Sequence, residues 1–160
     1  MDSVVTRPAV LRLQRGFTTT ELMIVVAIMA VLTAIAVPNM RSMIQTQRLR
    51  TASFDLNAGL TLARSEAIKR NSTVTMTPGA SGWVDGWTVT DSGGNMVGKQ
   101  DKWTQVAVAG PGTVSFNGMG RLVGPATQFQ ISSDELSNDK WRCLKLDISG
   151  RPVSLVGGCP

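Results

Sequence analysis

The feature that most restricts this chain is an uncharged run from Leu22 to Val37, in which Thr33 is the only polar residue. Counted from Phe17, the segment has 21 residues, and a helix of that length spans about 31 Å, which matches a bilayer core. One carboxylate, Glu21, stands at its start, although burying an unpaired carboxylate in lipid is costly. The run predicts a membrane-spanning helix whose single acidic residue needs a reason to be there.

The residues on either side of this run indicate how it sits in a membrane. Arg7, Arg12 and Arg15 precede it, and a basic flank keeps the N-terminus in the cytoplasm and sends the remainder outward. A cleaved signal peptide is the alternative, and it requires an A-x-A-like site after the apolar run. Here residues 36–40 read AVPNM and lead into a polar helical pattern, which favours a retained anchor.

The spacing of four residues carries a family resemblance. Gly16 is followed by Phe17, Glu21 is the fifth residue after that glycine, and Pro38 is the twenty-second. This pattern resembles the N-terminus of type IV pilins and type II secretion pseudopilins. The resemblance implies that residues 1–16 are a leader, that prepilin peptidase cuts between Gly16 and Phe17, and that the same enzyme methylates the new N-terminal amine.

Cleavage at this position gives Glu21 a partner. The new amine on Phe17 is a cation at the start of an apolar helix, and in a filament Glu21 of one subunit can approach the amine of its neighbour. Such pairing offsets the desolvation of both charges and fixes the axial register between subunits. The alternative is a carboxylate that is simply solvated among lipid headgroups.

Beyond residues 17–38, helical periodicity resumes over residues 39–71. We expect Pro38 to kink the helix without ending it, and Asn71-Ser72 to close it. One apolar stripe predicts packing against a sheet, and its members are Leu49, Ala52, Leu56, Leu60, Ala63 and Ala67. The opposite face is basic and predicts subunit packing or a solvated surface, with a nucleic-acid patch as the less favoured alternative; it carries Arg41, Arg48, Arg50, Arg64, Lys69 and Arg70.

Residues 72–160 change to short β-rich runs separated by turns that contain glycine and proline. The expected strands are 72–77, 87–90, 102–108, 113–117, 127–132, 140–147 and 151–156. Together they predict an α+β head, an antiparallel sheet packed on one long helix. The expected core aromatics are Trp83, Trp87, Trp103, Phe116, Phe129 and Trp141.

The head carries a narrower resemblance. The motifs are LARSEAIKRN at 62–71, GW at 82–83, GWTV at 86–89, VSFN at 114–117 and GR at 120–121. They resemble FimT and FimU minor pilins and GspH pseudopilins. This implies a pilin fold and a minor pilin that helps to initiate pilus assembly and packs near the tip, with a periplasmic head and an inner-membrane anchor. Its partners would be other major and minor pilins and the assembly platform. The alternative within the family is the H-type pseudopilin of a type II secretion system.

We find no catalytic constellation, cofactor motif or metal site in the sequence. Histidine is absent, which removes the usual general base and metal ligand. The glycine-rich stretch at 118–124 lacks the helix that a phosphate loop must open, and the one at 94–99 lacks the spacing and the hydroxyl residue of a Walker loop. We therefore expect a protein that is not an enzyme and works by packing.

The cysteines allow two readings. If the head is periplasmic, a disulfide between Cys143 and Cys159 is expected; in the cytoplasm they would be free thiols. A hairpin over residues 144–155 places Cys143 opposite about residue 156, and Gly157-Gly158 would let the tail fold back to it.

The last candidate site is for DNA. Some FimT-like minor pilins bind DNA through a C-terminal Gly-Arg-x-Arg stretch, and this chain matches only its first half, at Gly150-Arg151, with Val153 in place of the second arginine. Lys145, Arg142 and Arg121 are further candidate phosphate contacts.

Overall fold

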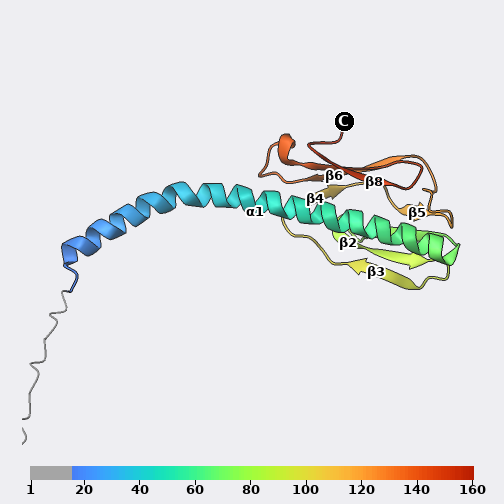
Figure 1. The fold of residues 1–160 in the computed structure, drawn as a ribbon, viewed down its shortest axis with the longest axis horizontal. Coiled ribbons are helices and arrows are strands. Elements are labelled where there is room, and N and C mark those ends of the chain that lie inside the picture. Colours follow the sequence, from blue (N-terminus) through green and yellow to red (C-terminus); the bar gives the residue numbers. More distant parts are fainter. Residues whose placement is uncertain (1–15) are drawn as a thin grey trace, which may run out of the picture. The chain divides into compact units, whose positions relative to one another are not determined.

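The computed structural model describes residues 16–160, so the expected leader lies outside it except for Gly16 (Figure 1). One helix, α1, runs from Thr19 to Arg70 and continues through Pro38. The chain divides into two units, Met1–Pro38 and Asn39–Pro160. In the first unit, every described side chain from residue 16 to residue 37 is exposed.

The N-terminal part of α1 is long and apolar enough to cross a membrane. Its most apolar 18-residue window has a mean hydropathy of 2.4, and none of that window is buried. Among residues 16–160, α1 alone meets this description. The apolar run therefore indicates membrane anchoring, as the sequence predicts.

In the second unit, the predicted stripe on α1 is confirmed, because all six of its members are at most 1% exposed. The helix ends as expected at Asn71. That residue adopts a left-handed conformation, with φ 46°. The Asn71 N–H bonds to Ile68 O at 3.2 Å, and the Ser72 N–H bonds to Ala67 O at 3.2 Å. These two bonds form a Schellman cap with asparagine in place of the usual glycine.

The head contains two four-stranded antiparallel sheets, where the sequence suggested one. Their strand orders are β3-β2-β1-β5 and β4-β6-β7-β8, which we call sheet A and sheet B. The strands are β1 Val74–Gly79, β2 Gly82–Asp91, β3 Met96–Gln100, β4 Ala107–Ala109, β5 Val114–Phe116, β6 Thr127–Ser132, β7 Arg142–Leu146 and β8 Pro152–Val156, with a 3₁₀ turn at Asn138–Lys140. Figure 1 shows the C-terminal half of α1 running along both sheets.

Three strand predictions were incomplete. β2 begins at Gly82, five residues earlier than expected, because Gly79 pairs with Gly82 and leaves only a two-residue turn between the strands. β3 was missed altogether. The run predicted at 102–108 forms a strand only over Ala107–Ala109, while its earlier part is a loop that buries Trp103.

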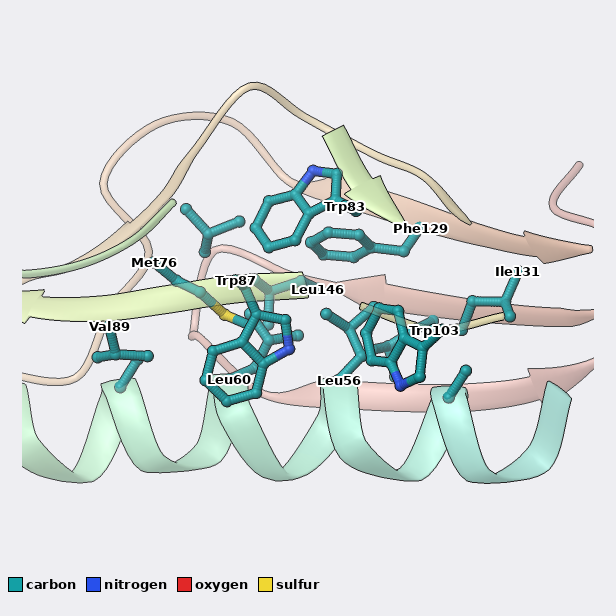
Figure 2. Packing of buried hydrophobic residues seen from close by; sticks show 14 of the residues in the cluster. Leu56, Leu60, Met76, Trp83, Trp87, Val89, Trp103, Phe129, Ile131 and Leu146 are labelled. Atoms are coloured by element: carbon teal, nitrogen blue, oxygen red, sulfur yellow. The ribbon is translucent and has the colours of Figure 1, made fainter. Parts of the chain in front are cut away.

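The core lies between α1 and the two sheets, and the predicted aromatic residues fill it. Trp83 and Phe129 meet edge to face, with ring centroids 4.9 Å apart. Figure 2 shows Leu56 and Leu60 of α1 among these side chains. Of the six predicted core aromatics, five are buried, and Trp141 is partly buried against the same cluster.

Candidate functional site

The start of α1 is organised by a capping box that the sequence analysis missed. The backbone N–H and the hydroxyl of Thr18 both donate to Glu21 Oε2, each at 3.0 Å. In return, the Glu21 N–H donates to Thr18 Oγ1 at 3.2 Å. The residues TTTE at 18–21 fit the S/T-x-x-E pattern that precedes an apolar run, so the signal was present in the sequence.

This geometry leaves Glu21 able to bind a further partner. Both bonds from Thr18 go to one carboxylate oxygen, and Oε1 accepts none from residues 16–160. Glu21 is exposed, as are Gly16 and Phe17 on its N-terminal side, and the Phe17 side chain is 85% exposed. A cation arriving from outside the subunit can therefore reach Glu21 without disrupting the helix cap.

At the other end of the chain, Cys143 and Cys159 form a disulfide, with their Cα atoms 5.0 Å apart. Cys143 pairs with Leu155 across the β7–β8 hairpin, one residue from the expected register. The tail then turns back at Gly157, whose φ is 105°. The Cys159 N–H donates to Gln130 Oε1 at 2.5 Å, so the tail lies against β6 as well as β7.

The four candidate DNA contacts do not gather into one patch. Arg142 and Lys145 are three residues apart on β7, and side chains at that spacing point to opposite faces of a sheet. Lys145 lines an open cleft of about 690 Å³ together with Gln128 and Gln130. Arg142 instead points toward α1, where its charge meets that of Arg50.

The other two arginines share one end of the head. Arg121 follows Gly120, and Gly150, next to Arg151, packs directly on the Gly120 carbonyl. The carboxylate of Asp147 organises this turn by accepting bonds from the Ser149 hydroxyl and the Arg151 N–H. These two hydrogen bonds, in that order, lower the pKa of Asp147, so a negative charge sits beside Arg151 at neutral pH.

The glycine-rich stretches that resemble nucleotide loops have structural roles. Residues 96–100 form β3, which pairs with β2. Residues 117–120 form a turn closed by a bond of 2.8 Å from the Gly120 N–H to Asn117 O, and Leu122 then bridges back to Phe116. Over residues 16–160, no group of three or more His, Cys, Asp or Glu side chains is placed to hold a metal ion.

Two solved structures resemble this fold. Both are crystal structures of the type IV minor pilin FimU of Pseudomonas aeruginosa strain PAO1. The form in space group P21 is 24% identical and has a TM-score of 0.59, covering 67% of this chain and 87% of FimU. The form in space group P65 is 23% identical and has a TM-score of 0.58, covering 66% of this chain and 91% of FimU. At this identity the likeness establishes the fold.

Two family models match separate parts of the sequence. The prokaryotic N-terminal methylation motif matches residues 11–37. The model described as type II transport protein GspH matches residues 52–150, more than half of the chain. A comparison with curated proteins finds no match. The motif model covers the apolar anchor and the GspH model covers most of the head, so the chain belongs to the GspH family of pilin-like proteins.

Proposed function

We propose that this chain is a minor pilin of a type IV pilus, which helps to initiate assembly and packs into the filament near its tip. In this proposal prepilin peptidase cleaves between Gly16 and Phe17 and methylates Phe17. The anchor then holds the subunit in the inner membrane with its head in the periplasm. From there the assembly platform transfers it into the filament, where it packs against other major and minor pilins.

The observation that carries the proposal is the exposed helix from Leu22 to Val37 with an accessible carboxylate at its start. An apolar surface of this size is unstable in water, so it must be covered by lipid or by other subunits. Lipid alone supplies no countercharge for Glu21, whereas the methylated amine of an adjacent subunit does. The free Oε1 and the family match both favour this role.

The experiment separates the two things that Glu21 can do. Glu21→Gln removes the charge, but its amide oxygen can still accept the capping bonds from Thr18. Thr18→Ala is the matched control, because it removes the cap hydroxyl and leaves the carboxylate. We expect Glu21→Gln to insert normally but to be several-fold depleted in sheared filaments, as quantified by immunoblot against the membrane fraction. Thr18→Ala should incorporate like the wild type.

If instead Thr18→Ala is depleted from filaments and Glu21→Gln incorporates normally, the carboxylate serves only as a helix cap. If both variants incorporate normally, the register role of Glu21 is wrong. In each strain the mass of the mature chain must first show that processing is unchanged, since an uncleaved subunit would also be missing from filaments.

A second candidate is the H-type pseudopilin of a type II secretion system, which the description of the matching family favours. The same processing, anchoring and Glu21 pairing would apply. The two functions differ in their consequence: a strain lacking this chain loses surface pili in the first case, and loses secreted proteins while keeping its pili in the second.

DNA binding is a third candidate, and the arrangement of arginines gives it limited support. Arg121 and Arg151 lie at the same end of the head, where both are exposed. Arg142 points away from Lys145, and the Asp147 carboxylate offsets part of the charge of Arg151. A phosphate site here would rest on two arginines, which predicts weak, salt-sensitive binding without sequence preference.

A further inference from the structure

The guanidinium of Arg142 is left without a partner in an unusual position. Its Nη1 is buried, and no acceptor among residues 16–160 takes a hydrogen bond from it. Burial, followed by the positive charge of Arg50 on α1, lowers the pKa of Arg142. A half-buried cation that faces a second cation destabilises the free subunit, so its presence needs a reason.

The carboxylates of the head do not neutralise this pair. The ion pairs within residues 16–160 are Glu66 with Lys69 and Arg70, Asp91 with Arg70, Asp101 with Lys99, and Asp85 with Lys102. Neither Arg50 nor Arg142 takes part in any of them. The fold thus brings two arginines together from different elements and leaves both charges unmatched.

Each arginine of the pair has an exposed apolar neighbour. Phe54 follows Arg50 by one helical turn on the same side of α1, and its side chain is 73% exposed. Val156 is the cross-strand partner of Arg142, and it is also 73% exposed. A hydrogen bond of 3.0 Å between the hydroxyls of Ser53 and Ser154 fixes α1 against β8. We call the four residues Arg50, Phe54, Arg142 and Val156 the arginine patch.

We propose that the arginine patch binds an aspartate or glutamate side chain of an adjacent pilin subunit, with the apolar rim packing around the contact. The proposal rests on the assembly function proposed above. Guanidinium groups bind carboxylates through paired, charge-assisted hydrogen bonds. Arginine and aromatic side chains together are typical of the residues that dominate protein interfaces. A phosphate of DNA would satisfy the arginines, but nucleic-acid interfaces are polar and leave no use for Phe54 and Val156.

The test uses the full-length chain in cells that assemble the filament. A photo-crosslinking benzoylphenylalanine replaces Phe54, which preserves an aromatic side chain there. We expect an adduct with another pilin-like subunit, identified by mass spectrometry. Arg142→Met and Arg50→Met, each added to this background, should lower the adduct yield about tenfold or more, because a charge-assisted contact is lost. Lys99→Met, which removes one positive charge on sheet A, is the control and should leave the yield unchanged.

A stability measurement guards against misfolding of the variants. Because Arg142 has no partner to lose, purified Arg142→Met should unfold at the wild-type temperature or above it. Arg50 is exposed, so Arg50→Met should also unfold like the wild type. If the adduct identifies a glutamate or aspartate at the contact, changing that residue to lysine in the partner should abolish the adduct, and Arg50→Glu should restore it.

Several results would overturn the inference. One is an adduct yield that is undiminished in both methionine variants. Another is an adduct with DNA, shown by its sensitivity to nuclease, in place of a protein. A third is an unfolding temperature of Arg142→Met that falls markedly while its adduct yield is unchanged. Absence of an adduct from the chain that carries only the crosslinker at position 54, when that chain is present in filaments, also refutes it and leaves the minor pilin proposal standing. A chain that is never found in filaments refutes the proposed function itself.

Discussion

Removing the disulfide is the perturbation whose magnitude can be worked out most directly. Cys143 and Cys159 are separated by 16 residues in the sequence. Opening a loop of about this length returns chain entropy to the unfolded state, equivalent to about 3 kcal/mol in the loop-closure treatment. The bond also holds the tail against Gln130, so that contact weakens with it.

The expected result is a large fall in the unfolding temperature of the head. For a domain of this size, each kcal/mol corresponds to a few degrees, so the Cys143→Ala, Cys159→Ala double variant should unfold about 10 to 15 °C below the wild type. All four tryptophans of the chain lie in the head. Their fluorescence therefore follows unfolding of the head alone in the full-length, detergent-solubilised protein, without a contribution from the anchor.

Single variants distinguish loop closure from lost packing. Either single substitution breaks the same loop, but only Cys143 is fully buried. If loop closure dominates, the unfolding temperatures of both single variants and of the double variant should fall by similar amounts. A shift below about 3 °C in the double variant would refute the entropy reasoning. A much larger effect of Cys143→Ala than of Cys159→Ala would assign the stability to packing at the buried site.

Three further predictions test the anchor, the core and the surface charges. Mass spectrometry of the mature chain should find methylated Phe17 at its N-terminus. Gly59→Ala should lower the free energy of unfolding by about 1 to 2 kcal/mol, since a Cβ there would lie 2.6 Å from Trp87 Cη2 and the gain in helix propensity is smaller than the cost of overpacking. Hydrogen bonds from Asn95, chiefly from its side chain, lower the pKa of Asp91. The ionised Asp91 carboxylate therefore stabilises the fold above the unfolded pKa of about 3.9, and this stabilisation is lost as the pH falls through the lower folded pKa. The measurement is the unfolding temperature of the wild type and of Asp91→Asn at two pH values. At pH 7 the wild type should unfold at a higher temperature than the variant, and this difference in unfolding temperature should shrink at pH 3.

The parts of the fold that follow a simple period were predictable from the sequence. The stripe on α1 repeats every three or four residues over several turns, and all of it is buried as predicted. β2 was only partly recognised because its alternation is interrupted. Gly86 has a φ of 87°, and it and Trp87 are buried consecutively, so the period of two fails in the middle of the strand.

Other elements depend on contacts that no local pattern reveals. β3 contains Gly98 and Lys99, which are poor strand formers, yet it pairs with β2. Gly98 lies so close to α1 that a Cβ would meet the Leu62 side chain at 2.7 Å. The division into two sheets likewise follows from which strands pair across long intervals, as when β1 pairs with β5.

The functional residues also divide into those that a local sequence pattern reveals and those that depend on distant contacts. The spacing of Gly16, Phe17 and Glu21 could be recognised because it recurs as a motif, and the Thr18 cap could have been predicted from the four residues TTTE at 18–21. The opposite orientation of Arg142 and Lys145 was not predicted, although the expected strand over residues 140–147 already implies it by strand alternation. The meeting of Arg142 with Arg50 could not be foreseen, because it depends on where α1 crosses sheet B.

Glu21 and Arg142 pose the same physical problem at two places in the subunit. Each is a charge for which the described chain provides no ion-pair partner, and each lies beside exposed apolar surface that is unfavourable in water. In the free subunit no countercharge neutralises either group, and the buried Nη1 of Arg142 makes no hydrogen bond within residues 16–160. In the proposed filament one neighbour supplies a cation to Glu21, and another contact supplies a carboxylate to Arg142. A neighbour without the matching charge leaves the group desolvated and unpaired, which costs more than a matched pair gains. If the filament assembles as proposed, the unmatched charges reject wrong neighbours, while the apolar surface around them provides most of the binding free energy.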